Sequence, residues 1–167
     1  MSVGTLAQGT AEPALKAAFL YNFVKFTDWP AEAAPSDAAI RLCVLGDEAV
    51  GTALEQTVKN RQVDGHPLTM ARVNLDGALR SCHLLYVTGL DRRRSMQLME
   101  RVQGAPVFTV SDLEAFAALG GVGQLFVENG KMRFALNPAS AQRAELRISS
   151  KLLALAKVVK DETAVTP

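Results

Sequence analysis

The 167-residue sequence carries almost no net charge, because 18 basic residues stand against 17 acidic ones for a formal charge of +1. This balance excludes the strongly basic surface that binding to nucleic acid or to an anionic membrane requires. No apolar run approaches the roughly 18 residues of a membrane-spanning helix, so we expect no membrane insertion. Hydrophobic residues still make up 49% of the chain, and a single domain of this length can therefore bury a substantial core.

Residues for metal binding and catalysis are also scarce. The sequence has two cysteines, Cys43 and Cys82, and two histidines, His66 and His83, with no zinc-like spacing among them. It has no nucleophile elbow, no phosphate loop and no dinucleotide-binding glycine motif. Asp47 follows a predicted strand, as a phosphorylated receiver aspartate would, but the remaining receiver residues cannot be assembled. We therefore expect no metal, no cofactor and a protein that is not an enzyme but acts by binding.

The first third of the chain predicts a mostly buried helix over residues 12–28. Leu15, Phe19, Phe23 and Phe26 recur there at helical spacing. Pro13 suits the first helical turn, and the Trp29–Pro30 pair ends the pattern.

The middle of the chain alternates between predicted strands and helices. Continuous apolar runs predict buried strands, Asp91 is placed to cap a helix, and Ser111 and Glu114 have the spacing of a capping box before another short helix. The predicted strands cover residues 40–45, 68–72, 82–87 and 106–110, and the predicted helices cover 49–58, 92–102 and 112–116. Arg92, Arg93 and Arg94 are interpreted as a solvated helix face, with a phosphate site as the alternative.

The last third predicts a tight hairpin, because Asn129–Gly130 separates two strand patterns over residues 124–128 and 131–136. Helices are predicted over residues 139–144 and 149–159. The fold class is therefore α/β: a single domain with a mixed, mainly parallel sheet flanked by helices, a β-hairpin in its C-terminal half and a closing helix. We assign residues 12–159 to this domain, 1–11 to a flexible N-terminus and 160–167 to a flexible tail.

Three polar groups interrupt these patterns. They are Asn22 with Lys25 on the first helix, Glu128 with Lys131 and Arg133 around the hairpin turn, and Arg147 with Ser149, Ser150 and Lys151 before the last helix. Structural roles account for each group as well as binding does: a polar helix edge, cross-strand charge pairs and a helix cap.

Several segments together resemble the YfiR-like family in order and over about residues 12–159. The first runs from Leu15 through Tyr21–Asn22 and Lys25 to Trp29–Pro30, and the last is Leu146–Arg147–Ile148–Ser149–Ser150–Lys151–Leu152–Leu153. Between them lie further matching segments: Arg41–Asp47, Cys82–Val87, Val110–Asp112, Phe116–Ala117, Gly120–Gly121, Glu128–Phe134 and Asn137.

The resemblance implies a function. Proteins of this family are exported, soluble periplasmic domains, and the characterised type represses a membrane-bound diguanylate cyclase by binding its periplasmic part. An outer-membrane lipoprotein relieves that repression, and the repressor is a homodimer. We therefore expect a periplasmic regulator of cyclic di-GMP signalling whose signal peptide has been removed. The alternative is a periplasmic small-ligand-binding module that serves another membrane sensor, with its site near residues 147–151 and the hairpin.

The resemblance also implies which residues matter. Cys43 and Cys82 match one cysteine pair of the redox-sensing type, and a disulfide between them is geometrically feasible if the compartment is oxidising. The second, closely spaced pair of that type is missing here. For contacts with the partner or ligand we select the polar or bulky members of the matching motifs: Asn22, Trp29, Glu128, Arg133, Arg147 and Lys151.

Overall fold

The structure is a computed structural model that describes the backbone of residues 3–161 and the side chains of residues 12–161. Five α-helices, one short 3-10 helix and ten strands follow one another in these residues. In chain order they are α1 (Val3–Lys25), β1 (Thr27–Asp28), β2 (Ile40–Leu45), α2 (Glu48–Val58), β3 (Gln62–Val63), β4 (His66–Arg72), η1 (Leu79–Ser81), β5 (Leu84–Val87), α3 (Arg92–Val102), β6 (Phe108–Ser111), β7 (Gly123–Glu128), β8 (Lys131–Leu136), α4 (Pro138–Arg143), β9 (Arg147–Ile148), α5 (Ser150–Leu155) and β10 (Lys157–Val158).

An eight-stranded sheet forms the centre of the domain, in the order β10-β8-β7-β6-β5-β2-β4-β3. Strands β4, β2, β5, β6 and β7 are parallel, whereas β8 returns antiparallel to β7 and β3 pairs antiparallel with β4. A separate ribbon joins β1 to β9. The expected mixed, mainly parallel sheet with a late hairpin is therefore confirmed.

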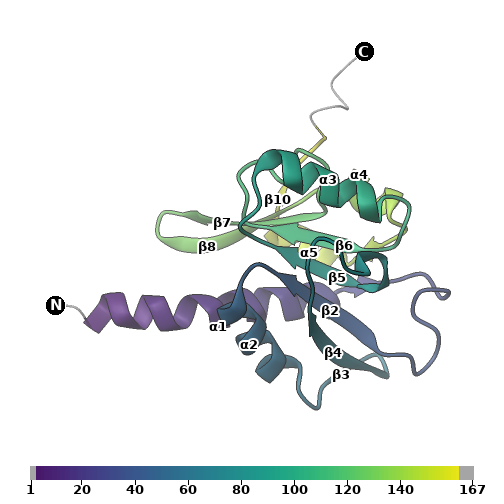
Figure 1. Cartoon of the computed structure of the whole chain (residues 1–167), viewed down its shortest axis with the longest axis horizontal. Coiled ribbons are helices and arrows are strands. Elements are labelled where there is room, and N and C mark those ends of the chain that lie inside the picture. The colour runs from purple at the N-terminus through teal and green to yellow at the C-terminus, as the bar shows by residue number, and fades with distance from the viewer. Residues whose placement is uncertain (1–2, 162–167) are drawn as a thin grey trace.

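The helices cover the two faces of this sheet (Figure 1). Because side chains alternate along a strand, Leu42 and Val44 of β2 join the core that contains α1 and α2. Cys43 and Leu45 join the second core, under α3 and η1. Aromatic rings anchor α1, since Phe23 stacks on Phe108 and meets Phe134 edge to face.

Local sequence signals account for several boundaries. The Asp91 side chain accepts a hydrogen bond from the Arg94 amide and begins α3 at the predicted residue. Asn129 and Gly130 both have positive φ, 52° and 76°, as a two-residue hairpin turn requires. The hairpin prediction is confirmed.

The first helix differs from the prediction at its beginning. It starts at Val3, so Pro13 lies inside it and the domain boundary predicted at residue 12 falls within a helix. Proline removes one backbone donor, but the alanines around it favour the helix.

The expected short helix after Ser111 is not formed, and residues 113–120 are a bend and turns instead. Ser111 accepts a hydrogen bond from the Leu113 amide, two residues on. Ala115 has a φ of 66°, which a right-handed helix cannot contain. The capping-box interpretation is therefore wrong.

The closing helix is shorter than residues 149–159. It ends at Leu155, after which β10 pairs parallel with β8 and the Val159 amide donates to the Leu136 carbonyl. The strand pairing satisfies backbone groups on the outer edge of β8, which would stay unpaired if residues 157–159 continued the helix. The structure also orders Asp161, within the predicted tail, whereas residues 162–167 lie outside the described part of the chain.

Candidate functional site

The ribbon of β1 and β9 brings together two of the residues selected from the sequence. Trp29 directly follows β1, and its position before Pro30 disfavours a continued helix. Asp28 pairs in register with Arg147, and the Ser149 amide donates to the Phe26 carbonyl over 2.8 Å. Trp29 and Arg147 therefore lie at one end of α1, although more than a hundred residues separate them in sequence.

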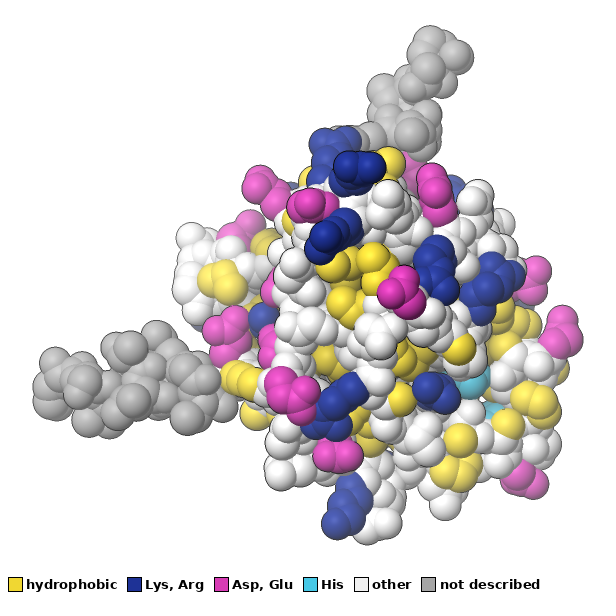
Figure 2. Space-filling view, in the orientation of Figure 1, with side chains coloured by type: hydrophobic (Ala, Val, Ile, Leu, Met, Phe, Trp, Pro, Cys, Tyr) yellow, Lys and Arg dark blue, Asp and Glu magenta, His cyan; other side chains and the backbone are white. Residues whose placement is uncertain are grey.

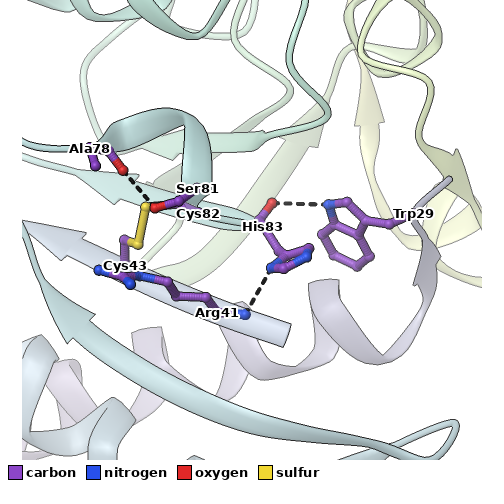
Figure 3. Close-up of a disulfide and its surroundings, with 7 residues drawn as sticks. All are labelled: Trp29, Arg41, Cys43, Ala78, Ser81, Cys82 and His83. Atoms are coloured by element: carbon purple, nitrogen blue, oxygen red, sulfur yellow. Dashed lines mark hydrogen bonds between the residues drawn. A yellow bond between two sulfur atoms is a disulfide. The ribbon is translucent and has the colours of Figure 1, made fainter. Parts of the chain in front are cut away.

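Trp29 is half-buried against the residue that precedes β5. Its Nε1 donates to the His83 carbonyl over 3.1 Å, and the two rings lie edge to face with centroids 5.9 Å apart. Figure 3 shows the indole beside the His83 ring, with Arg41 on the other side of that ring. The hydrogen bond fixes the indole, so Trp29 presents a defined ring orientation.

Two backbone groups hold the His83 ring in one tautomer. Nδ1 accepts from the Arg41 amide over 2.9 Å, and Nε2 lies 2.7 Å from the Ala33 carbonyl oxygen. Because a carbonyl only accepts, Nε2 carries the proton and His83 is neutral. Burial lowers the pKa of His83 below its ordinary value. The hydrogen bond to the Ala33 carbonyl raises this pKa and the nearby His66 lowers it, but burial is the largest of the three effects.

The disulfide between Cys43 and Cys82 lies next to this histidine (Figure 3), and both cysteines are buried. Their Cα atoms are 5.9 Å apart. Cys43 belongs to β2, and Cys82 lies two residues before β5, the strand that neighbours β2. The disulfide that the family resemblance left open is therefore present. It forms one end of a series of neighbouring residues that runs through His83 to Trp29 at the surface.

Shallow hollows surround the ribbon. One of about 700 Å³ is lined by Asp28, Trp29, Gln142, Glu145 and Arg147, among others. Another, of about 380 Å³, lies beside it and adds Lys25. We call the surface formed by Lys25, Asp28, Trp29, Gln142, Glu145 and Arg147 the Trp29 face. It places an aromatic ring and an arginine, two residue types enriched at protein interfaces, among other charges of both signs.

The other selected residues lie elsewhere or at the margin. Lys151 is exposed on the first turn of α5, four residues after Arg147, and Asn22 is exposed on α1. Glu128 and Arg133 form an ion pair of 3.6 Å across the hairpin. The hairpin points along α1 toward its N-terminal half (Figure 1), away from the β1–β9 end. The structure therefore does not join the hairpin charges to Arg147 in one site.

A polar cluster missed by the sequence reasoning lies at the carboxyl ends of the parallel strands. Lys16 pairs with Asp112 over 3.3 Å, and Asp112 also accepts from Thr88 over 2.8 Å and from Tyr86 over 3.4 Å. Burial, reinforced by the Asp112 carboxylate, raises the pKa of Tyr86 to about 12. Lys16 lies at helical spacing from Leu20 on the buried side of α1, and a lysine on an apolar stripe is the signal that would have revealed the cluster.

A second missed cluster secures the end of the described chain. Asp161 is buried, accepts from Asn137 and Ser140, and pairs with Arg143 over 2.8 Å. Although burial favours the neutral form, these donors lower the pKa of Asp161. No sequence signal distinguishes this aspartate, because its partners lie on the loop and helix that follow β8.

The rest of the surface carries charges of both signs and no extended patch of one sign on the side that Figure 2 shows. On the side seen in Figure 2, basic and acidic side chains are interspersed. Across residues 3–161, no three histidine, cysteine, aspartate or glutamate side chains are grouped so as to hold a metal ion. None of the helices described is long and apolar enough to cross a membrane.

Comparison with known proteins adds a family and a fold. A family model described as YfiR/HmsC-like matches residues 13–157. A conserved domain protein from Vibrio cholerae has a similar fold, with a TM-score of 0.53 and 12% identity over 78% of this chain and 57% of its own. The ABC domain in complex with L-Trp from Streptococcus pneumoniae gives a TM-score of 0.57 and 11% identity over 86% of this chain and 60% of its own. The chain thus spans less than two thirds of both solved chains, and the likeness shows the α/β fold alone.

Proposed function

The chain belongs to the YfiR/HmsC-like family, and from this we propose that it is a periplasmic inhibitory binding protein. Its target is the periplasmic part of a membrane-bound diguanylate cyclase, so it controls cyclic di-GMP made on the other side of the membrane. It acts by binding rather than by catalysis. A homodimeric state and release by an outer-membrane lipoprotein belong to the same proposal.

The buried disulfide supports this location. Disulfides form and persist in oxidising compartments such as the periplasm, and Cys43 and Cys82 are joined inside the domain rather than on its surface. A bridge that joins β2 to the segment just before β5 contributes to the fold itself. An exported protein is the class in which such a bridge is expected.

The Trp29 face is the surface that we propose for the contact, and it carries the proposal. Tryptophan and arginine are enriched among the residues that dominate binding energy at protein interfaces. The Trp29 indole is already held by the His83 carbonyl, so little ordering remains to be done on binding. Arg147 is exposed, and its guanidinium has no ion-pair partner in the part of the chain that the structure describes. It is therefore available to a carboxylate of the cyclase.

Inhibition requires that the protein bind the inactive state of the cyclase more tightly than the active one. Shifting the cyclase from almost entirely active to almost entirely inactive requires that the protein bind the inactive state about 10⁴-fold more tightly, a difference of ~5.5 kcal/mol in binding free energy. Three interface residues that each favour the inactive state by ~2 kcal/mol supply this. The Trp29 face offers that number of suitable side chains.

The second candidate is a periplasmic small-ligand-binding module for another sensor. The hollows around the β1–β9 ribbon favour it. Its ligand would lie against Trp29 or Arg147 rather than at the hairpin, because the hairpin points away from that end of α1 (Figure 1).

The test uses bacterial cells that carry whichever membrane diguanylate cyclase is encoded nearest to the gene of this protein. The chain is exported to the periplasm and cyclic di-GMP is quantified. We expect a fall that requires export, and an Arg147→Glu variant should lose most of it. Arg93→Glu is the matched control, because Arg93 is also exposed but lies on α3, over the other face of the sheet.

If the exported protein leaves cyclic di-GMP unchanged, control of the cyclase is refuted and the ligand-binding candidate takes its place. If Arg147→Glu and Arg93→Glu behave alike while the wild type represses, the protein is a repressor but the Trp29 face is not its contact surface.

A further inference from the structure

The outer edge of β8 is only partly covered by β10. Within the described chain, β10 pairs with the last two residues of β8 alone, although β8 extends over Lys131–Leu136. The Val159 amide donates to the Leu136 carbonyl, whereas the Asn137 amide donates to the Val122 carbonyl on the β7 side. Because the backbone groups of successive residues point to opposite edges of a strand, the even-numbered residues of β8 face the outer edge.

Met132 therefore directs its amide and carbonyl groups to an edge that no strand of the described chain covers. Its partner in the sheet is Val127, on the β7 side. Within residues 3–161 no turn or loop contributes a backbone hydrogen bond to Met132. Unpaired N–H and C=O groups on a strand edge are a template for a further strand. The backbone of this edge is thus complementary to an extended chain.

Exposed apolar side chains gather beside this edge. Of the five large hydrophobic residues that are exposed among the described side chains, four lie around β8: Leu15, Val127, Leu155 and Val158. Val127 is in register with Met132, and Val158 with Leu136. Leu15 lies one turn of α1 before Phe19, whose ring meets Phe134 edge to face. Exposed apolar residues that gather in one place mark an interaction site more often than scattered ones do.

The opposite face of the hairpin is mainly basic. Because side chains alternate along a strand, Lys131 and Arg133 point away from α1. Lys157 lies on the same face, with its Nζ 6.0 Å from the centre of the Phe126 ring, and Phe126 is in register with Arg133. Glu128 pairs with Arg133 over 3.6 Å. Three exposed cations thus stand against one exposed carboxylate, which favours acidic side chains on this face of an added strand.

The same charges disfavour a second copy of this chain as the occupant. A two-fold axis that makes one continuous sheet would pair the two β8 strands antiparallel. With Met132 on the axis, Lys131 would lie opposite Arg133 of the second copy, and with Arg133 on the axis two arginines would meet. Like charges directly opposite each other are destabilising. Self-pairing is therefore disfavoured, whereas pairing with an acidic strand is favoured.

We propose that the free edge of β8 binds an extended segment of a partner protein in which acidic and apolar residues alternate. The segment adds a strand beside Met132, with its carboxylates against Lys131 and Arg133 and its apolar side chains beside Val127. In such strand addition, main-chain hydrogen bonds give affinity and alternate side chains give specificity. The hairpin points away from the β1–β9 end of α1 (Figure 1), so this surface is separate from the Trp29 face.

The experiment titrates the full, disulfide-bonded chain with a synthetic peptide of alternating glutamate and valine. One control peptide has lysine in place of glutamate. A second has N-methylated valines, which keep the charges but cannot donate the main-chain hydrogen bonds of a strand. NMR follows the amide signals of β8 and the hydrogen exchange of the Met132 amide. We expect saturable shifts and slower exchange at Met132 with the acidic peptide, and binding at least about tenfold weaker for both controls.

A charge reversal tests the basic face. Arg133→Glu changes an exposed residue of β8 and should weaken binding of the acidic peptide at least about tenfold. Arg93→Glu is the matched control, because it makes the same change at an exposed residue of α3, over the other face of the sheet. This control should bind the peptide as the wild type does.

Equal binding of the N-methylated and unmodified peptides would show that no strand is added. Equal binding by the two variants would show that the basic face takes no part. Either result overturns the proposal, as does the absence of saturable shifts. Protection of the Met132 amide that grows with protein concentration, without peptide, would assign the edge to a second copy and would also overturn it. The measurement uses purified protein and no cyclase, so its outcome is independent of the cyclic di-GMP experiment.

Discussion

Loss of the disulfide between Cys43 and Cys82 should lower the free energy of unfolding by an amount that follows from the chain between them. The cysteines are separated by 39 residues. In the chain-entropy model a loop of this length restricts the unfolded state by about 13 cal/mol/K, which is about 4 kcal/mol at 25 °C. Both cysteines are buried, so the bridge also fixes β2 against the start of β5 in the native state.

This loss is large compared with the stability of an ordinary domain, about 5–15 kcal/mol. The reduced protein should therefore remain folded in the absence of denaturant but unfold at much lower urea. The slope of the unfolding free energy against urea should rise on reduction, since the reduced chain exposes more surface when it unfolds.

The assay is urea unfolding followed by the fluorescence of Trp29, the one tryptophan in the sequence. Wild-type protein is measured with and without a thiol reductant, and a Cys43→Ala/Cys82→Ala variant is measured under both conditions. The variant should match the reduced wild type to within the cost of two small cavities and should not respond to the reductant. A stability change below about 1 kcal/mol on full reduction would refute the loop-entropy reasoning.

Two further predictions concern packing and pH. Gly121→Ala should destabilise the domain by about 1–3 kcal/mol, because the added Cβ would lie 2.1 Å from the buried Phe116 ring. Gly51→Ala in α2 is the contrast, because its added Cβ meets only the Arg72 side chain, at 3.4 Å. Alanine at position 51 should stabilise the helix by about 0.5–1 kcal/mol. Urea melts of both variants decide, and equal losses would contradict the packing argument. The lowered pKa of His83 means that the unfolded chain takes up a proton first as pH falls below about 6.5, so stability should decrease there and remain constant above it. A His83→Gln variant should lose this pH-dependent part, and an unchanged slope in urea melts from pH 7 to pH 5 would contradict the assignment.

Long, continuous local patterns in the sequence were sufficient to predict most of the sheet. The apolar runs of β2 and β5, the Asp91 cap of α3 and the Asn129–Gly130 turn each encode their structure within a few residues. The two-residue strands β1, β9 and β10 contain no such period. They exist only because a partner strand far away in sequence offers hydrogen bonds, so no window of local sequence could reveal them.

The same limit applies to the candidate site. Trp29 and Arg147 were selected because they belong to matching motifs, and the β1–β9 ribbon places them side by side. Lys131 and Arg133 were recognised beside the hairpin turn, but the free edge of β8 was not predicted. It exists because β10 pairs with only the last two residues of β8, which is a property of the folded chain alone.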